Sequence, residues 1–233
     1  MVYFRELFVL YLSVRKPVEG KQIMATPRAQ RIGIWIITVV MAIGAVGVYF
    51  VAILANNNDS ASSAKLQQIY NDYTAKVDAQ ASELSSKYYA TFSPFASSVH
   101  SFEKAAAQEK LVTEDLLVGD GETITDTTPF AAYYIGWNPD GNIFDQSISS
   151  GALKSPFSIT SGLANTSVIV GWQEGLVGMK IGGVRELTIP SEKAYGSSGS
   201  GSTIPADTPL KFVVMAIPLP EEIPVPQELQ TSQ

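Results

Sequence analysis

The 233-residue sequence contains no cysteine and only one histidine, His100. The absence of cysteine excludes thiol nucleophiles, disulfide bonds, zinc knuckles and iron–sulfur clusters. A single histidine excludes metal sites with two or three histidine ligands, and a Ser-His-Asp triad would have to use His100. His100 stands in an amphipathic stretch, where a lone histidine is usually a surface residue. No metal site and no cofactor is therefore predicted.

Charged residues are also scarce, at 16% of the chain against 45% hydrophobic residues. This composition is too apolar for a disordered chain. The net charge of −6 argues against general nucleic-acid binding. Charge is unevenly distributed, because residues 1–31 carry six basic and two acidic side chains, whereas the remaining 202 residues carry ten basic and twenty acidic ones.

A long hydrophobic run lies at the boundary between these two regions. Residues 32–55 read IGIWIITVVMAIGAVGVYFVAILA and include no charged side chain. As a helix they would span about 36 Å, enough for a hydrocarbon core of about 30 Å. The basic flank at 1–31 places the amino terminus in the cytoplasm and the acidic remainder outside. The sequence therefore predicts a single-pass membrane protein with a cytoplasmic segment at 1–31 and a transmembrane helix at 32–55.

Two alternatives remain open for this region. The apolar run ends in Ala52-Ile53-Leu54-Ala55, which has the small residues of a signal-peptide cleavage site. Residues 1–23 are either a surface-lying segment or untranslated, because Met24 is also a plausible start.

Residues 56–110 are predicted to be a helical linker or stalk. Apolar residues recur at steps of three and four from Leu66 to Tyr88, which is typical of one face of a helix. Pro94 is expected to break or kink it. These helices either form a stalk that binds a partner or pack on each other and on the following domain. The proline-rich segment 218–233 predicts an extended, disordered tail.

Residues 111–217 have a different pattern, in which apolar runs alternate with turn signals. Residues 130–137, 183–189 and 210–217 read as strands, and Asn138-Pro139-Asp140-Gly141 reads as a hairpin turn. A short helix is expected at 170–177. Several strands with one short helix indicate an antiparallel α+β domain.

Nine short motifs stand in order along this domain: Tyr134-x-Gly136, Asp140-Gly141-x-x-Phe144-Asp145, Pro156-Phe157, Val168-Ile169-x-Gly171-Trp172-x-Glu174-Gly175-Leu176, Gly178-Met179-x-x-Gly182, Ile189-Pro190, Ala194-Tyr195-Gly196, Ile204-Pro205 and Leu210-x-Phe212. With these motifs at these spacings, residues 111–217 resemble the FKBP family of peptidyl-prolyl cis–trans isomerases. The resemblance implies an antiparallel sheet of five or six strands curled around one short helix. In this chain a transmembrane helix and a helical stalk would precede it.

The resemblance also implies a pocket between sheet and helix. Its predicted catalytic residues are Tyr134, Asp145 and Tyr195. Its substrate-binding residues would be Phe144, Phe157, Val168, Ile169, Trp172, Ile204 and Phe212. Trp172 would form the floor, and the Ile169 N–H and the Tyr195 hydroxyl would donate hydrogen bonds to the bound peptide. Taken singly, the aromatic residues would more often belong to the core of a small β domain.

Two departures from the family pattern affect this site. Ser200 stands near a position where many relatives have histidine, in a loop of small polar residues at 197–203. The usual basic partner of Asp145 is not obvious; Lys154 is a candidate, in the poorly matching segment 148–155.

Isomerisation of a prolyl bond needs no nucleophile, metal or histidine. The sequence therefore predicts a membrane-anchored isomerase, with its catalytic domain outside the cytoplasm, that assists the folding of exported proteins. Its expected partners are proline-containing polypeptides, with a rapamycin-type macrolide as a possible ligand. The alternative hypothesis is an FKBP-like module that binds proline-containing segments with little or no turnover.

Overall fold

The computed structural model describes residues 60–230. The predicted cytoplasmic segment 1–31 and transmembrane helix 32–55 lie outside the described residues, so both stay predictions. Among residues 60–230, no helix combines the length and the apolar character needed to cross a membrane.

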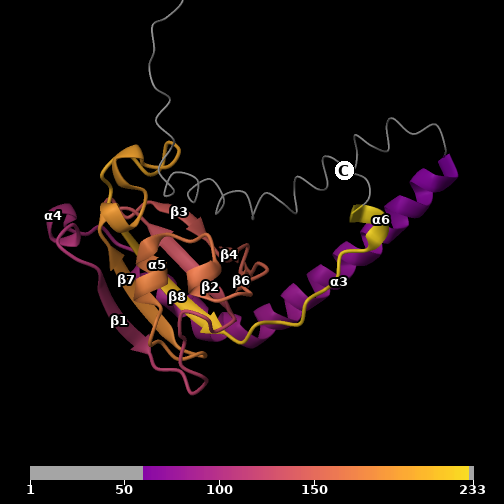
Figure 1. The fold of residues 1–233 in the computed structure, drawn as a ribbon, viewed down its shortest axis with the longest axis horizontal. Coiled ribbons are helices and arrows are strands. Elements are labelled where there is room, and N and C mark those ends of the chain that lie inside the picture. Colours follow the sequence, from indigo (N-terminus) through magenta and orange to yellow (C-terminus); the bar gives the residue numbers. More distant parts are fainter. Residues whose placement is uncertain (1–59, 231–233) are drawn as a thin grey trace, which may run out of the picture.

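The fold is built on a six-stranded antiparallel sheet with the order β1-β7-β8-β2-β3, in which β6 also pairs with β2 (Figure 1). Strand β2 has three partners: it pairs with β8 from Ala131 to Trp137, with β6 at its start and with β3 at its end. The strands are β1 (Val112–Leu117), β2 (Phe130–Trp137), β3 (Ile143–Gln146), β6 (Phe157–Ile159), β7 (Val184–Ile189) and β8 (Leu210–Ile217). A separate hairpin joins β4 (Ile148–Ser149) to β5 (Ala152–Leu153).

Alternate residues of β2 and β8 point to opposite faces of the sheet, as the period of a strand requires. On one face, called the inner face here, Tyr134 of β2 lies opposite Val214 of β8. On the outer face, Tyr133 lies opposite Met215. Every residue of β2 is buried, so both faces of the sheet are covered.

The inner face is covered by the short helix α5 (Val170–Gly175) and by η2 (Leu163–Asn165). Two further short helical turns, η3 (Ser191–Lys193) and η4 (Gly196–Ser198), connect β7 to the loop that leads into β8. These elements confirm the predicted antiparallel sheet with one short helix.

The outer face is covered by the end of the long helix α3 (Ser60–Phe92) and by η1 (Ser93–Ser98). Phe92 is fully buried there, and Leu84, Tyr88, Phe95 and Phe102 pack around it. The segment also includes the short helix α4 (Lys104–Ala107). The end of α3 is thus part of the folded domain, whereas its amino-terminal half projects away from the sheet (Figure 1).

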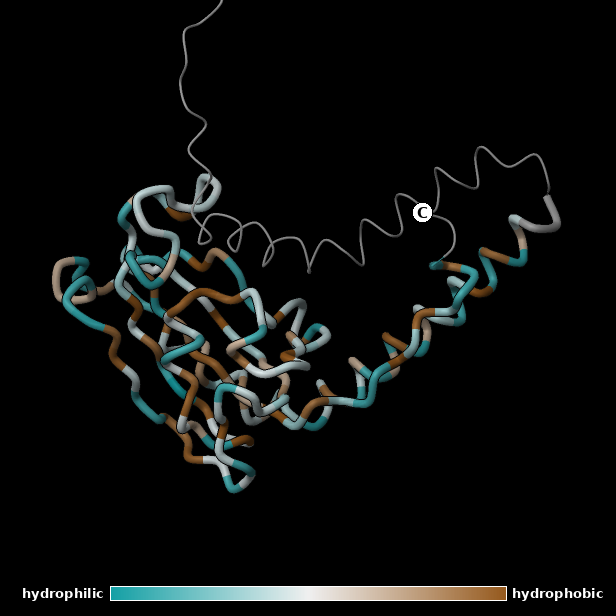
Figure 2. The backbone as a smooth tube through the Cα atoms, viewed as in Figure 1, coloured by the Kyte–Doolittle hydropathy of each residue, from teal (hydrophilic) through white to brown (hydrophobic). Residues whose placement is uncertain are grey.

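Both hypotheses for the helical region describe a part of it: the end of α3 packs on the domain, and its amino-terminal half projects from it. The apolar series from Leu66 to Tyr88 does form one helix, and Pro94 lies just after its end. From about Leu84 onward its side chains pack on the sheet and do not form a free stalk. Figure 2 shows that apolar residues are concentrated in the sheet, whereas apolar and polar residues alternate along α3.

The carboxy-terminal segment differs from the prediction. It is extended, as its prolines indicate, but residues 218–230 lie along α3 and end in a short helix, α6 (Gln227–Gln230) (Figure 1). Gln80 of α3 donates a hydrogen bond to the Glu221 carbonyl (2.7 Å), and Leu219 packs on the outer-face core. Helix α3 supplies the surface on which residues 218–230 lie, and the sequence of that segment does not reveal this contact.

Candidate functional site

Helix α5 lies very close to strand β7 because glycine faces the strand at two positions. A Cβ on Gly171 would lie 2.3 Å from Ile189 Cγ2, and one on Gly175 would lie 2.9 Å from Leu187 Cδ2. A side chain at either position would therefore force Ile189 or Leu187 to shift. This close packing places Trp172, the residue after Gly171, among the aromatic rings of the inner face.

The carboxy-terminal end of α5 is held by Arg185 of β7. This buried guanidinium donates to the carbonyl of Gly175 (2.9 Å), the last residue of α5, and to that of Val177 (3.2 Å), two residues beyond the helix. Asp115 of the neighbouring strand β1 pairs with the same guanidinium at 2.6 Å. The sheet therefore fixes α5 by shape and by hydrogen bonds.

Trp172 is the centre of an aromatic cluster. Its ring centroid lies 5.4 Å from that of Tyr134, 6.1 Å from Phe157 and 5.6 Å from Phe212, with interplanar angles of 81°, 89° and 83°. Phe144 stands against Phe212 in the same edge-to-face manner, at 5.5 Å. Trp172 and Phe212 are buried at 4% exposure, whereas Phe144 and Phe157 are partly exposed. The cluster thus has a buried base and an accessible rim.

Gly136 makes the meeting of these rings possible. It lies opposite Phe212 in the β2–β8 register, and a Cβ there would come within 2.6 Å of Phe212 and 2.7 Å of Phe144. The glycine of the Tyr134-x-Gly136 motif therefore serves the geometry of the site directly.

Three predicted wall residues, Val168, Ile169 and Ile204, are buried in the same apolar cluster, and Tyr195 packs against it from a partly exposed position. Within the described part of the chain, neither the Ile169 N–H nor the Tyr195 hydroxyl donates a hydrogen bond. Both predicted donors are thus free to bind a ligand. The Trp172 Nε1–H is likewise buried with no partner among residues 60–230.

Asp145 stands beside the cluster and is held by two donors. The Tyr134 hydroxyl donates to Oδ2 at 2.5 Å, and the Gln146 N–H donates to Oδ1 at 2.8 Å. Burial, followed by this hydrogen bond to Asp145, raises the pKa of Tyr134 well above its ordinary value. Burial, followed by the charge of Asp145, raises the pKa of Tyr195 to about 12. Both phenols therefore remain protonated donors at neutral pH.

Lys154 does not pair with Asp145, contrary to the sequence-based expectation. Its ammonium group donates to the carbonyl of Gln146 at 3.0 Å. In residues 60–230 no ion pair includes Asp145. The expectation of a cation was wrong because the partners of Asp145 are a phenol and a backbone N–H. A backbone donor leaves no signal in the sequence.

The serine-rich loop around Ser200 forms a tight backbone turn. The Ser200 N–H donates to the Ile204 carbonyl (2.7 Å), and the Ile204 N–H donates back to Ser200 (3.2 Å). Gly199 has a φ of +63°, and a Cβ there would lie 2.3 Å from the Ile204 carbonyl oxygen. The loop positions Ile204 through its backbone, because its own side chains are small.

All ten predicted site residues are thus gathered in one region of the inner face. Nine belong to or pack against its apolar cluster, and Asp145 joins it through Tyr134.

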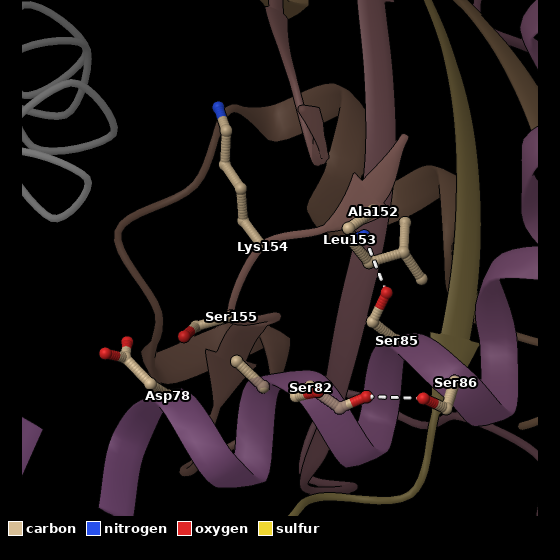
Figure 3. Close-up of a pocket in the computed structure, with 9 residues that line it drawn as sticks. Asp78, Ser82, Ser85, Ser86, Ala152, Leu153, Lys154 and Ser155 are labelled. Atoms are coloured by element: carbon tan, nitrogen blue, oxygen red, sulfur yellow. Dashed lines mark hydrogen bonds between the residues drawn. The ribbon is translucent and has the colours of Figure 1, made fainter. Parts of the chain in front are cut away.

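A separate cavity lies on the other side of the molecule, between α3 and β5 (Figure 3). Its volume is about 570 Å³, and it contains none of the predicted site residues. Two of its hydroxyls already bind the backbone: Ser85 accepts from the Leu153 N–H, and Ser86 donates to the Ser82 carbonyl. We interpret this cavity as the groove where helix and hairpin meet.

Comparison with known proteins gives consistent results. The FKBP-type peptidyl-prolyl cis-trans isomerase family model matches residues 121–217. An FK506-binding protein of Neisseria meningitidis serogroup B is 42% identical over 104 residues, which are 45% of this chain and 91% of that protein. A probable FK506-binding protein of Corynebacterium glutamicum is 39% identical over 109 residues, 46% of this chain and 86% of that one. The crystal structure of a peptidyl-prolyl cis-trans isomerase from Pseudomonas syringae matches 50% of this chain and 87% of its own, with 31% identity and a TM-score of 0.41.

Proposed function

The chain belongs to the FKBP-type peptidyl-prolyl cis-trans isomerase family, and from that premise we propose that its aromatic cluster accelerates rotation about peptide bonds that precede proline. Resonance gives such rotation a barrier of about 18–20 kcal/mol. Uncatalysed exchange therefore takes roughly tens to hundreds of seconds. A folding chain with a non-native prolyl isomer has to wait for that time.

The chemistry follows from the difference between the planar and the twisted amide. Rotation removes resonance, so the carbonyl of the transition state is less dipolar and needs less solvation. An apolar site with Trp172 as its floor and Phe144, Phe157 and Phe212 as its walls favours the twisted form over the planar one. Interactions that are stronger in the transition state than in the ground state raise the rate.

Two donors orient the peptide in this proposal. The Ile169 N–H and the Tyr195 hydroxyl would bind backbone carbonyls of the substrate, and Val168 and Ile204 would complete the walls. Asp145, held by Tyr134, would face the twisted amide from the edge of the site. The observation that carries the proposal is the pair of unpartnered donors, Ile169 N–H and Tyr195 hydroxyl, beside the buried Trp172 ring.

We further propose that residues 32–55 anchor the protein in a membrane, with residues 56–233 outside the cytoplasm. The apolar run and the basic flank at 1–31 support this. Helix α3 begins at Ser60, only five residues after the run, and its 33 residues span about 50 Å. Its projecting half would hold the catalytic domain away from the bilayer, where it would meet exported polypeptides.

The test of activity is prolyl isomerisation of a short proline-containing peptide by the full chain in detergent micelles. We expect acceleration by the wild type, and a roughly fivefold loss for Tyr195→Phe, which removes one hydrogen bond of about 1 kcal/mol. Asp145→Ala should lower the rate as well. If the chain binds a macrolide but does not accelerate isomerisation, the binding-module hypothesis holds and the enzyme hypothesis is refuted. If the chain shows no binding and no acceleration, both hypotheses are refuted.

The test of anchoring is independent of turnover. The full chain should sediment with membranes and resist extraction by salt. Protease added to the outside of intact cells should cleave it after residue 56. A soluble chain, or one protected from outside protease, would contradict the proposed topology.

A further inference from the structure

The segment from Ser191 to Asp207 carries two of the site residues, Tyr195 and Ile204. It leaves β7 at η3 and returns toward β8, so its two ends have to be held together. The Asp207 N–H donates to the Gly196 carbonyl at 2.9 Å. This bond closes the loop from within.

A second closure comes from outside the segment, through the side chain of Gln108. Its Oε1 accepts hydrogen bonds from the Ser191 N–H (2.8 Å) and from the Ser191 hydroxyl (3.0 Å). Its Nε2 donates to the Asp207 carbonyl at 2.9 Å. One amide group therefore bridges both ends of the loop, at partners 83 and 99 residues away in the chain.

The backbone around Gln108 is itself fixed. Gln108 ends helix α4, where its N–H donates to Ala105, and the preceding Ala107 is buried at 4% exposure. Three residues later, Leu111 packs against the inner-face core. The amide is thus presented from an anchored segment.

The far end of the loop needs such support because Asp207 has a left-handed backbone, with a φ of +54°. This conformation costs a residue other than glycine roughly 1–2 kcal/mol. The Gln108 amide binds the carbonyl of that same residue and so stabilises the conformation.

We propose that Gln108 is a positioning residue for the isomerase reaction: it fixes both ends of the 191–207 loop, so that the Tyr195 hydroxyl and Ile204 stay at the aromatic cluster. This inference rests on the proposed function. Gln108 lies before residues 121–217, the range matched by the family model. The helical segment before the catalytic domain would then contribute to the site as well as to the core.

The test compares Gln108→Met with Gln80→Met in the full chain in detergent micelles. Methionine keeps the length of the side chain and removes its polar atoms. Gln80 is the matched control, because it also donates to a backbone carbonyl, that of Glu221, but on α3. Catalysis is measured with a proline-containing peptide, macrolide affinity by titration, and loop closure by amide hydrogen exchange at Asp207.

We expect Gln108→Met to raise KM and weaken macrolide binding about tenfold, with kcat changed less than about twofold, because only the fraction of molecules with an ordered loop binds. The Asp207 amide should exchange faster. Ser191→Ala, which removes one of the three bonds, should shift KM roughly twofold in the same direction. Gln80→Met should change none of these quantities. Should Gln108→Met fail to fold, Ser191→Ala carries the test alone.

Unchanged KM and unchanged Asp207 exchange in Gln108→Met would overturn the inference, and so would an equal effect of Gln80→Met. A wild type that does not accelerate isomerisation would instead refute the proposed function. Macrolide affinity and Asp207 exchange would then still decide whether Gln108 holds the loop.

Discussion

Both faces of the sheet are covered by helix, but the helix on the inner face leaves aromatic side chains partly exposed, whereas the helix on the outer face buries them. On the inner face, the six-residue α5 lies against β7 through glycines and leaves a ring of partly exposed aromatic side chains. On the outer face, the last turns of α3 seal a core in which Phe92, Tyr133 and Trp137 are fully buried.

The strand β2 shows this division residue by residue. Tyr133 and Tyr134 are neighbours in sequence, yet Tyr133 packs beneath Phe92 and Tyr88, while Tyr134 contacts Trp172 and bonds to Asp145. Alternation along the strand thus places the residues of the outer core and those of the candidate site on opposite faces of the sheet. Mutations on the outer face should leave the turnover of the folded protein unchanged, whereas mutations on the inner face should lower it.

The largest expected effect is on the outer face. Phe92→Ala removes a fully buried ring and should lower the free energy of unfolding by about 3–5 kcal/mol. The kcat/KM of the molecules that remain folded should stay unchanged. Denaturant unfolding and an isomerase assay below the unfolding transition measure the two quantities. Val118→Ala, at a side chain 70% exposed, is the control and should change neither. A large loss of kcat/KM in folded Phe92→Ala would show that the faces are coupled.

Gly136→Ala should give the largest effect on the inner face. The added methyl would lie 2.6–2.7 Å from Phe212 and Phe144, so the two rings must separate. Such overpacking costs about 1–3 kcal/mol of stability. We expect a roughly tenfold or greater loss of kcat/KM in protein that is still folded at the assay temperature. Normal turnover would mean that the meeting of these two rings is not needed for catalysis.

The two neighbouring tyrosines provide a matched pair that sharpens the comparison. Tyr134→Phe removes the hydroxyl that holds Asp145, and we expect a roughly threefold to tenfold loss of kcat/KM. Tyr133→Phe removes a buried hydroxyl that has no partner among the described residues, so stability should be unchanged or slightly higher. Isomerase assays and thermal unfolding of both variants test this. Equal effects of the two changes would contradict the assignment of the two faces.

How much of this could be predicted from sequence depends on the distance between interacting residues. The ten candidate residues of the inner face were predictable only through the family resemblance, which short strings such as Ala194-Tyr195-Gly196 carry, and their role in a site stays a prediction. The outer face was predictable only in part: the spacing from Leu66 to Tyr88 indicates that one face of the helix is covered, but not by what. Nothing local relates Phe92 to Tyr133.

Polar contacts between distant segments were not predictable at all. The Gln108 amide meets Ser191 and Asp207 because the fold brings the end of α4 beside η3, and a glutamine after a short alanine-rich helix carries no mark of that role. The partners of Asp145 are nearer in sequence, a phenol eleven residues away and the adjacent N–H, but the residue types did not indicate this pairing either. Geometry of this kind belongs to the tertiary fold.

The smallest expected effect concerns pH, and it too separates the faces. Burial, followed by the charge of Asp145, raises the pKa of Tyr195 from 10.0 to about 12, and burial raises the pKa of Tyr133 on the outer face still further. Because the folded protein holds these protons more tightly than the unfolded chain, their contribution to stability is complete below pH 10 and declines as pH rises toward 12. Turnover should therefore change less than about twofold between about pH 7 and about pH 9, because Tyr195 remains a donor throughout.

Tyr195→Phe and Tyr133→Phe divide that alkaline decline between the two faces. Tyr195→Phe and Tyr133→Phe should each remove a part of the decline in unfolding free energy that begins near pH 10.0, the ordinary pKa of both phenols. The part removed by Tyr195→Phe should end near pH 12, whereas the part removed by Tyr133→Phe should continue to higher pH. Denaturant unfolding at several alkaline pH values measures both, with ultraviolet difference spectra to count the phenolates formed. If the kcat/KM of the wild type already decreases at a pH lower than about 9, Tyr195 loses its proton at a lower pH than its burial allows. That result would mean that the Tyr195 side of the inner face is more exposed to solvent than the structure indicates.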